Sequence, residues 1–476
     1  MAVALVEEVR NVDLGDKRLN RRLGKLIAEL GAKPNLSIPA ATHARKEMEA
    51  AYRFFDNDKV SPAKILGPHI DATLERISQT DFVLLVQDTS ELDLTRPNQQ
   101  VKGAGPMDCE ARRGAFVHPL MAFDAEGLPL GTVWQKSWAR EEIETTLTKA
   151  EKCRKRQKTP IEEKESLRWL EGLRAARQVA ANCPQTVCVC VGDSEADIYE
   201  LFSEPRSAAP AELAAAPGEV HLLVRAGQTR CTRESNWLAE VRGGACLYRG
   251  VVNVSSRKSK ISVGKSKREQ SRDARVAEVE VRAARVTLRP PYRHDRKLPP
   301  VAVNVVLVEE ADPPAGDEPI QWLLVTTLPI EDPEQVQRIV RSYCLRWQIE
   351  IYFKTLKTGC RVEGRQFEQL DRVLNCVALY SIIAWRVMYL CRLGRECPDL
   401  DCEVVFEASE WRSVYATLKR QPAPSQPPRL NEMIRMIASL GGYILRKSTH
   451  PGPQTLWIGL QRVHDLSTAW ETFGPP

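Results

Sequence analysis

The sequence lacks the cysteine and histidine patterns that mark zinc sites and disulfide frameworks. It contains 13 cysteines, an odd number, and no two of them stand at a Cys-x-x-Cys spacing. Cys188 and Cys190 are the closest pair, and they lie in an apolar run typical of a buried strand. His118 and His221 are isolated in the sequence. The cysteines are therefore expected to be reduced thiols, and the two histidines to be structural.

Signals for export or membrane insertion are also missing. No run of about 18 apolar residues occurs, and the first ten residues, MAVALVEEVR, carry Glu7 and Glu8 where a signal peptide would be basic. These absences predict a cytoplasmic protein without a membrane partner, associated with the nucleoid if it binds DNA. The length of 476 residues allows two or three domains.

The sequence also lacks a strong excess of one charge. Its net charge of +6 is too small to indicate a nucleic-acid partner by itself. The distribution of charge is more informative. Between Ser255 and Lys297, 14 Lys and Arg residues face 5 Asp and Glu residues, a local excess of 14 − 5 = +9. Such a patch suits a polyanion, and a solvated loop is the alternative.

The first 70 residues are predicted to be helical. Asp16 is a candidate N-cap for a helix that gathers its leucines and isoleucine on one face. The other face carries Lys17, Arg18, Arg21 and Arg22. A basic face on a small helical module suits phosphate contacts, and an ordinary surface helix is the alternative.

Two aspartates follow apolar runs that predict buried strands, at 82–86 and 186–191. Asp88 and Asp193 therefore stand at strand ends, where sites form in α/β sheets, although an Asp there is often a turn residue or a helix cap. Further strands are predicted at 117–123 and 128–134, and helices at about 141–181, 194–202 and 370–393.

Residues 203–330 predict a β-rich insertion that carries the basic patch. A loop is expected at 208–218, where alanine and proline are frequent, and strands at 220–224, 276–281, 302–308 and 322–326. The whole pattern predicts an α/β region between helical segments, with a Pro-rich linker at 421–428 before a short helical tail.

A long amphipathic helix is predicted from Pro333 to Lys357, with Asp332 as N-cap and Gly359 as its stop. At about 100° per residue, five polar residues share a stripe roughly 80° wide beside an apolar stripe. One acid among cations and a phenol suits a surface that binds a cation and phosphate oxygens, and a row of surface salt bridges is the alternative. The five are Tyr343, Arg346, Glu350, Lys354 and Lys357.

Asp88, Asp193 and Glu350 together meet the need of two-metal phosphoryl transfer. Three carboxylates can hold two Mg²⁺ ions roughly 3.5–4 Å apart, one activating the nucleophile and one stabilising the leaving oxygen. Oxygen ligands without a His/Cys cluster suit Mg²⁺, and Mn²⁺ is expected to substitute for it.

The spacing Tyr343-x2-Arg346-x3-Glu350-x6-Lys357 resembles the Y-(2)-R-(3)-E-(6)-K signature of a family of bacterial insertion-sequence transposases, the DDE cut-and-paste enzymes of the transposon-five group. The resemblance runs from the basic N-terminal helix to the C-terminal tail. It includes residues 87–89, 164–166, 193–197, 440–442 and 451–453.

This resemblance implies an RNase H-like catalytic core at 71–375, with the β-strand insertion at about 203–330. It implies a helical DNA-binding domain at 1–70 and a helical dimerisation domain at 376–476. Asp88, Asp193 and Glu350 would be the metal-binding catalytic triad. The partners would be double-stranded DNA, as transposon ends and as target, and a second copy of the chain in the synaptic complex.

The resemblance also implies DNA contacts. Tyr343, Arg346 and Lys357 would hold phosphates near the cleavage site, and Arg225 would hold another. Trp322 matches a position that stacks on a flipped base, with a core strand residue as the alternative. Ser194 departs from a relative that carries Arg there, and the N-terminal helix shares basic character more than identities. Further candidates for DNA contact are Lys354, Arg365, Gln366 and Glu368.

The reaction implied is excision by strand nicking, hairpin formation and hairpin opening, followed by attack of the 3′-OH on target DNA. Two alternatives stay open. One is an RNase H-like endonuclease without strand transfer, and the other is an inactive protein that binds transposon ends.

Overall fold

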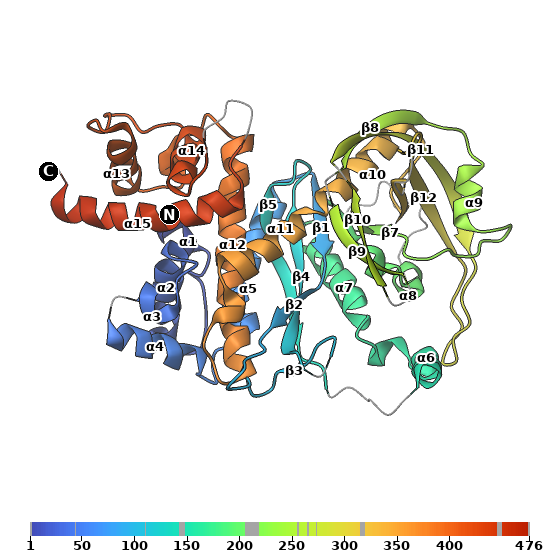
Figure 1. The fold of residues 1–476 in the computed structure, drawn as a ribbon, viewed down its shortest axis with the longest axis horizontal. Helices are drawn as coiled ribbons and strands as arrows, with labels where there is room; N and C mark the ends of the chain where they lie inside the picture. The colour runs from blue at the N-terminus through green and yellow to red at the C-terminus, as the bar shows by residue number, and fades with distance from the viewer. Residues whose placement is uncertain are drawn as a thin grey trace. The chain divides into compact units, whose positions relative to one another are not determined.

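The computed structural model describes residues 2–42, 44–109, 111–141, 148–204, 219–254, 257–263, 266–272, 274–314, 319–444 and 450–474. The chain divides into two compact units (Figure 1). Unit 1 joins Met1–Leu147 to Trp347–Pro476, and unit 2 is Thr148–Arg346. Each unit combines helices with paired β-strands, so the predicted α/β class is confirmed.

The N-terminal part of unit 1 is helical, as predicted. Asp16 caps α2 by accepting a hydrogen bond from the Arg18 N–H at 2.8 Å. Leu23, Leu26 and Leu30 are buried on one face of this helix, because residues three and four positions apart share a face. The helices are α1 (Ala2–Glu7), α2 (Lys17–Ala32), α3 (Ile38–Ala41), α4 (Arg45–Phe55) and α5 (Pro62–Ile77).

The strands of unit 1 are organised around β4 (Arg113–Phe123). Antiparallel to it lie β1 (Phe82–Gln87), β2 (Ser90–Asp93), β3 (Gly105–Pro106) and β5 (Pro129–Trp138). Val83 to Gln87 of β1 are all buried, as the apolar run predicts. A turn with Gly127 at φ 83° joins β4 to β5, and this positive φ favours glycine.

The C-terminal half of unit 1 is again helical. Its central helix, α12 (Leu370–Glu396), has a mean hydropathy of 1.6 over its most apolar window, and 89% of that window is buried. A buried core helix explains this apolar composition without a membrane. Around it lie α11 (Gln348–Lys354), α13 (Ala408–Lys419), α14 (Leu430–Leu440) and α15 (Pro453–Phe473), with short helical turns at Thr355–Gly359, Val362–Gly364 and Cys402–Val404.

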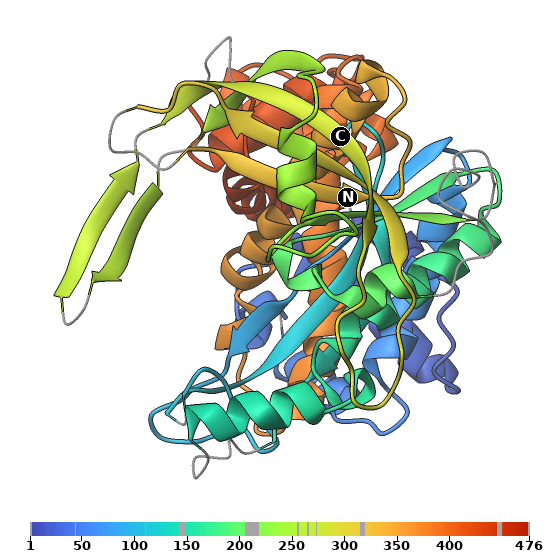
Figure 2. The ribbon, with the colours of Figure 1, turned by 90° about the vertical axis from the view of Figure 1, so that its right-hand side faces the viewer.

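The strands of unit 2 follow the order β6-β7-β13-β12-β11-β8. β6 and β7 are parallel, and the other neighbours are antiparallel. The strands are β6 (Val187–Gly192), β7 (Val220–Arg225), β8 (Tyr248–Val254), β11 (Arg275–Leu288), β12 (Val301–Glu310) and β13 (Gln321–Thr326). Figure 2 shows a separate yellow-green hairpin of β9 (Arg257–Val263) and β10 (Ser266–Arg272).

The helices of unit 2 are α6 (Lys149–Lys158), α7 (Leu167–Asn182), α8 (Tyr199–Ser203), α9 (Trp237–Arg242) and α10 (Pro333–Leu345), with 3-10 turns at Ile161–Glu163 and Ser194–Ala196. The predicted strands at 220–224, 276–281, 302–308 and 322–326 are all present. The loop predicted at 208–218 lies outside the described residues. The two compact units divide the chain after Leu147 and after Arg346. They do not test the domain boundaries predicted at 70 and 375, which stay a prediction.

The predicted helix from Pro333 to Lys357 is wrong in its continuity. Asp332 caps α10 as expected, but α10 ends at Leu345 and α11 begins at Gln348. A π-helical turn then carries Lys357. The 100° spacing does not hold across these interruptions, so the single stripe from Tyr343 to Lys357 is not a feature of one regular helix.

Two smaller expectations also need correction. The helix predicted at 194–202 is interrupted, because a 3-10 turn ends at Ala196 and α8 begins only at Tyr199. The insertion expected from residue 203 includes β7, yet β7 pairs in parallel with β6. β7 therefore extends the strand pairing that begins at β6.

Candidate active-site residues in the two units

Asp88 follows the last residue of β1 and is buried, with an exposed fraction of 8%. Its Oδ1 accepts a hydrogen bond from the Thr89 N–H at 2.7 Å. Burial makes an ionised carboxylate costly unless donors or a cation compensate, so its position at a strand end is suited to cation binding.

His118 on β4 holds the residues on both sides of Asp88. Its Nδ1 lies 2.8 Å from the Thr89 Oγ1, and its Nε2 lies 3.0 Å from the Gln87 Oε1. The imidazole is fully buried. The prediction of a structural histidine is thus refined, because His118 fixes the side chains that flank the first aspartate. The sequence carries no local signal for this contact, which depends on the pairing of β1 with β4.

Glu350 and Lys357 lie on the other segment of unit 1. Glu350 is half-buried in the first turn of α11, where the positive end of the helix dipole favours a carboxylate. The Lys357 Nζ donates to the Glu91 carbonyl oxygen at 2.8 Å and lies 3.2 Å from the Glu363 Oε1. Glu363, which no sequence motif indicates, also accepts the Asp93 N–H at 3.0 Å. Lys354 is exposed.

Asp193 follows β6 in unit 2 and is half-buried. Its Oδ1 accepts the Glu195 N–H at 2.8 Å, so Asp193 also caps a 3-10 turn. Asp193 therefore caps a helical turn, which was one of the two roles predicted for it. It also stands at the end of a buried strand, as the predicted metal site requires.

Tyr343 lies among charged residues from separate parts of unit 2. Burial raises the pKa of its phenol, the positive charges of Arg346 and Arg225 lower it, and the negative charge of Asp193 raises it. The Arg346 guanidinium lies 5.9 Å from the centre of the Tyr343 ring. A carboxylate, two guanidiniums and a phenol that interact within unit 2 form a set of groups suited to a phosphate.

Trp322 lies beside this group, on β13. Its ring centre is 6.3 Å from that of Tyr343, and the two planes are tilted by 57°. The indole is half-buried and also packs against Ala277 and Ile320. It thus combines a core contact with a partly open ring.

The basic face of α2 combines exposed cationic side chains with one that forms an ion pair. Lys17, Arg18 and Arg21 are exposed, whereas Arg22 lies 2.5 Å from the Glu47 carboxylate. Among the described residues, no ion pair involves the three exposed side chains. They suit phosphate contact better than Arg22 does.

Arg365 does not support the predicted DNA contact. Its guanidinium is buried, with an exposed fraction of 4%. It donates to the carbonyl oxygens of Pro34 and Cys360 and lies 4.3 Å from the centre of the Tyr380 ring. This arrangement corrects the prediction, because Arg365 ties the segment after α2 to the core of unit 1. Gln366 and Glu368 are exposed.

The basic patch predicted at 255–297 is only partly described, since the side chains of residues 253–273 lie outside the described part of the structure. The arginines after this segment are largely paired with acids. The pairs are Arg275 with Glu310, Arg282 with Glu280, Arg285 with Glu331, Arg293 with Glu200, and Arg296 with Glu162 and Asp295. This part of the patch is thus less available to a polyanion than the charge count predicts.

Carboxylate oxygens at Asp88, Asp193 and Glu350 are the donors that Mg²⁺ prefers. Asp88 and Glu350 belong to unit 1, and Asp193 belongs to unit 2. Across the part of the chain that the structure describes, no group of three or more His, Cys, Asp or Glu residues could hold a metal ion. The three-carboxylate metal site therefore stays a prediction.

Three families of known proteins match this chain. The family described as "Transposase DNA-binding" matches residues 1–60. "Transposase DDE domain" matches residues 224–385, and "Transposase Tn5 dimerisation domain" matches residues 382–469. The match at 224–385 includes Glu350 and the signature around it.

A solved structure is similar at low level: a cryo-EM structure of the piggyBac transposase synaptic complex with hairpin DNA, at 9% identity and a TM-score of 0.34. The alignment covers 79% of this chain and 66% of that chain, so the chain spans slightly less than two thirds of the length of that relative.

The three matched domains follow one another along the chain as DNA-binding, DDE and dimerisation domains, which is the domain set of a DDE transposase. The DDE domain implies an RNase H-like core flanked by helical domains. The chain belongs to the Tn5-like transposases, as its N-terminal and C-terminal domains both show.

Proposed function

We propose that this chain is a cut-and-paste transposase that excises a DNA element through hairpinned ends and joins the 3′-OH ends to target DNA. The observation that carries the proposal is the setting of Tyr343 in unit 2. Its ring centre lies 5.9 Å from the Arg346 guanidinium and 6.3 Å from the Trp322 ring centre, and the charges of Asp193 and Arg225 shift the pKa of its phenol. These residues come from three distant parts of the sequence, and they combine a carboxylate with phosphate-binding groups. The family supplies the reaction class.

Asp88, Asp193 and Glu350 are proposed to hold two divalent cations, Mg²⁺ or Mn²⁺. Their oxygen donors fit this chemistry, and DDE domains generally use divalent ions. When bound, such ions supply charge stabilisation for the attacking and leaving oxygens of a phosphodiester.

The other residues have roles that follow from their own chemistry. Arg346 and Arg225 offer guanidinium donors to the oxygens of the reacting strand. Burial raises the pKa of the Tyr343 hydroxyl, which stays protonated and would donate a hydrogen bond to a phosphate oxygen of the reacting strand. Lys357 is proposed to exchange its contacts with Glu91 and Glu363 for a phosphate. Trp322 is proposed to stack on an extruded base, which a hairpin intermediate requires.

DNA recognition and pairing are proposed for the flanking domains. Lys17, Arg18 and Arg21 on α2 would contact phosphates of the terminal inverted repeats, with sequence specificity supplied elsewhere in residues 1–60. Residues 382–469 would pair two copies in a synaptic complex. Such a protein would work inside the bacterial cell, at the nucleoid.

The test is incubation of purified protein with Mg²⁺ or Mn²⁺ on linear DNA that carries the terminal repeats flanking its own gene. Wild type is compared with Glu350→Ala and with Glu334→Ala, which removes an exposed glutamate from α10. Hairpinned excision products and joined target DNA are expected with wild type and Glu334→Ala and not with Glu350→Ala.

Other outcomes assign other functions. Cleavage without joining would indicate an endonuclease and would overturn the strand-transfer proposal. Binding of the repeats without cleavage by any variant would indicate an inactive end-binding protein.

A further inference from the structure

The helix α6 is the most basic regular element among those described. Its ten residues, Lys149–Lys158, contain six Lys and Arg residues and one acid, Glu151. The Glu151 carboxylate accepts the N–H and the hydroxyl of Thr148, at 2.8 and 2.7 Å, in a capping box. The acid therefore stabilises the start of the helix, and the helix keeps an excess of 6 − 1 = +5 charges.

The side chains of α6 that the structure describes give no packing reason for this helix. Every side chain that is described in it, from Ala150 to Lys158, is exposed. Figures 1 and 2 both show the helix away from strands β7 and β11–β13 of its own unit. A short helix without an apolar face gains little from tertiary packing, so its charge is the property that needs explanation.

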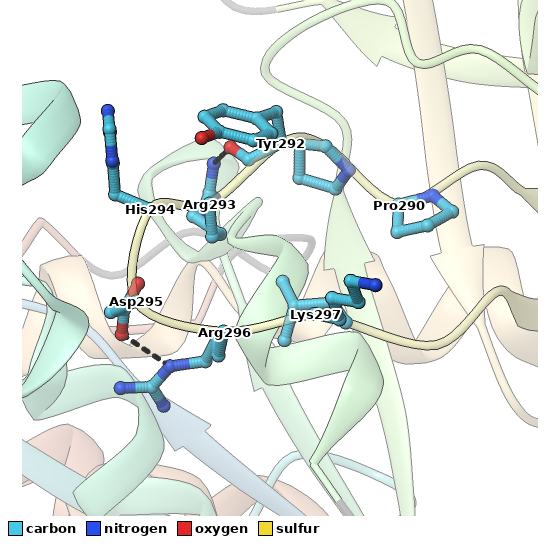
Figure 3. A pocket seen from close by; sticks show the side chains of 9 residues that line it. Pro290, Tyr292, Arg293, His294, Asp295, Arg296 and Lys297 are labelled. Carbon is cyan, nitrogen blue, oxygen red and sulfur yellow. Dashed lines mark hydrogen bonds and ion pairs between the residues drawn. The ribbon is translucent and has the colours of Figure 1, made fainter.

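The loop Pro290–Leu298 neutralises an acidic side chain near α6. Pro290–Leu298 lines a hollow of about 550 Å³, and Figure 3 shows Asp295 bonded to Arg296 there. The Arg296 guanidinium lies 2.6 Å from the Glu162 carboxylate, four residues beyond α6. Arg293, Asp295 and Arg296, three of the charged residues that line this hollow, are paired with opposite charges. Through Arg296, the loop also neutralises Glu162, an acid close to the basic helix.

We propose that α6 binds the phosphate backbone of duplex DNA without sequence preference and holds target DNA during strand transfer. This assignment rests on the proposed function. A run of Lys and Arg provides backbone contacts, which position a duplex without reading its bases. Contacts to phosphates alone suit DNA whose bases are not read, so we assign this surface to the target and not to the terminal repeats.

The test compares Arg154→Gln/Lys158→Gln with Arg233→Gln/Arg242→Gln, which removes the same charge from other exposed positions of unit 2. Binding to a labelled random-sequence duplex is measured by fluorescence anisotropy over a range of salt concentrations. The slope of log K against log salt is expected to become shallower by about 2 in the α6 variant and by nothing in the control, since each lost phosphate contact removes roughly 0.9.

The second measurement is joining of precleaved transposon ends to plasmid target. Joining is expected to fall about fivefold or more in the α6 variant, while cleavage at the ends and the melting temperature stay unchanged. Equal salt slopes in both variants would overturn DNA binding by α6. An equal loss of end cleavage would overturn the target assignment. If wild type neither cleaves nor joins DNA, both the proposed function and the assignment of α6 to target DNA are wrong. The salt slopes still show whether α6 binds DNA.

Discussion

Asp197 and Arg230 form a buried ion pair, and Asp197 stands four residues beyond Asp193. The Asp197 Oδ1 accepts the Arg230 Nε at 2.7 Å, and its Oδ2 accepts the N–H groups of Gly227 and Gln228 at 2.8 and 3.1 Å. The Asp197 side chain is only 1% exposed. This carboxylate therefore fixes the loop after β7 against the turn that carries Asp193.

The same loop approaches the turn too closely for a side chain at Gly227. A Cβ atom there would lie 2.7 Å from the Ser194 carbonyl oxygen. The loop begins directly after Arg225, so the Asp197 contacts also limit the movement of a proposed phosphate-binding residue.

Asp197→Ala is expected to destabilise the protein by about 3–5 kcal/mol, because it leaves the Arg230 charge buried without its partner. Urea unfolding measures the change. The matched control is Glu195→Ala, whose partner Arg168 lies 2.8 Å away but whose own side chain is 62% exposed. It is expected to cost less than about 1 kcal/mol. Equal costs for both variants would contradict the importance of the buried pair.

His118→Ala is expected to raise the Mg²⁺ concentration needed for half-maximal end cleavage by about 10-fold or more. The reason is that Gln87 and Thr89 lose the imidazole that fixes them on either side of Asp88, and residues that support metal ligands have effects of roughly 10–100-fold. End binding without metal should not change.

The control for His118 is His221→Ala, which removes another buried histidine, 3.3 Å from the Thr327 hydroxyl. It should lower stability without changing the Mg²⁺ requirement. His118→Asn, which keeps one hydrogen-bonding group, should fall between wild type and His118→Ala. A Mg²⁺ requirement raised equally by both alanine variants would show a general loss of stability instead.

Glu363→Gln is expected to strengthen binding of transposon-end DNA by about threefold. The amide oxygen can still accept the Asp93 N–H, but the negative charge 3.2 Å from the Lys357 Nζ is lost. A partly exposed charge of this kind is worth up to about 1 kcal/mol, or roughly fivefold in affinity. Anisotropy with a repeat duplex in EDTA measures the effect, and Glu334→Gln is the control. Unchanged or weaker binding would show that Glu363 does not oppose DNA at Lys357.

The sequence predicted much of this architecture because its signals are local. Apolar runs located β1 and β6 and therefore Asp88 and Asp193 at strand ends. Asp16 and Asp332 marked the starts of α2 and α10, since an N-cap side chain bonds within its own turn. The motif spacing identified Glu350 and its signature without any knowledge of the fold.

The contacts that the sequence could not predict all join residues far apart in the chain. Arg365 looked like a DNA contact because it is a cation beyond the signature, yet it satisfies carbonyl groups more than 300 positions away. His118 looked isolated because its partners lie on a paired strand. The interruption after Leu345 was equally hidden, because no proline or glycine marks it in Arg346-Trp347.

Glu8 anchors the N-terminal segment to the core of unit 1, and its titration should make stability depend on pH. Its Oε2 lies 2.6 Å from the His69 Nδ1, and its Oε1 lies 2.8 Å from the Arg76 guanidinium. Burial raises the pKa of Glu8, but the hydrogen bonds and charges of His69 and Arg76 outweigh it and lower the pKa to about 2.

Because this folded-state pKa lies below the ordinary value of 4.5, ionised Glu8 stabilises the fold fully above about pH 4.5. That contribution is lost as the pH falls toward 2. Glu8→Gln should therefore be less stable than wild type by about 3 kcal/mol at pH 7, and the difference should narrow progressively below about pH 4.5. Glu7→Gln is the control, since Glu7 is exposed and pairs only with Arg10 at 3.1 Å among the described residues. Its small effect should not narrow in this way. Urea unfolding at pH 7, 5, 4 and 3 decides the matter, and a constant gap between Glu8→Gln and wild type would rule out ionised Glu8 as the source of the stabilisation.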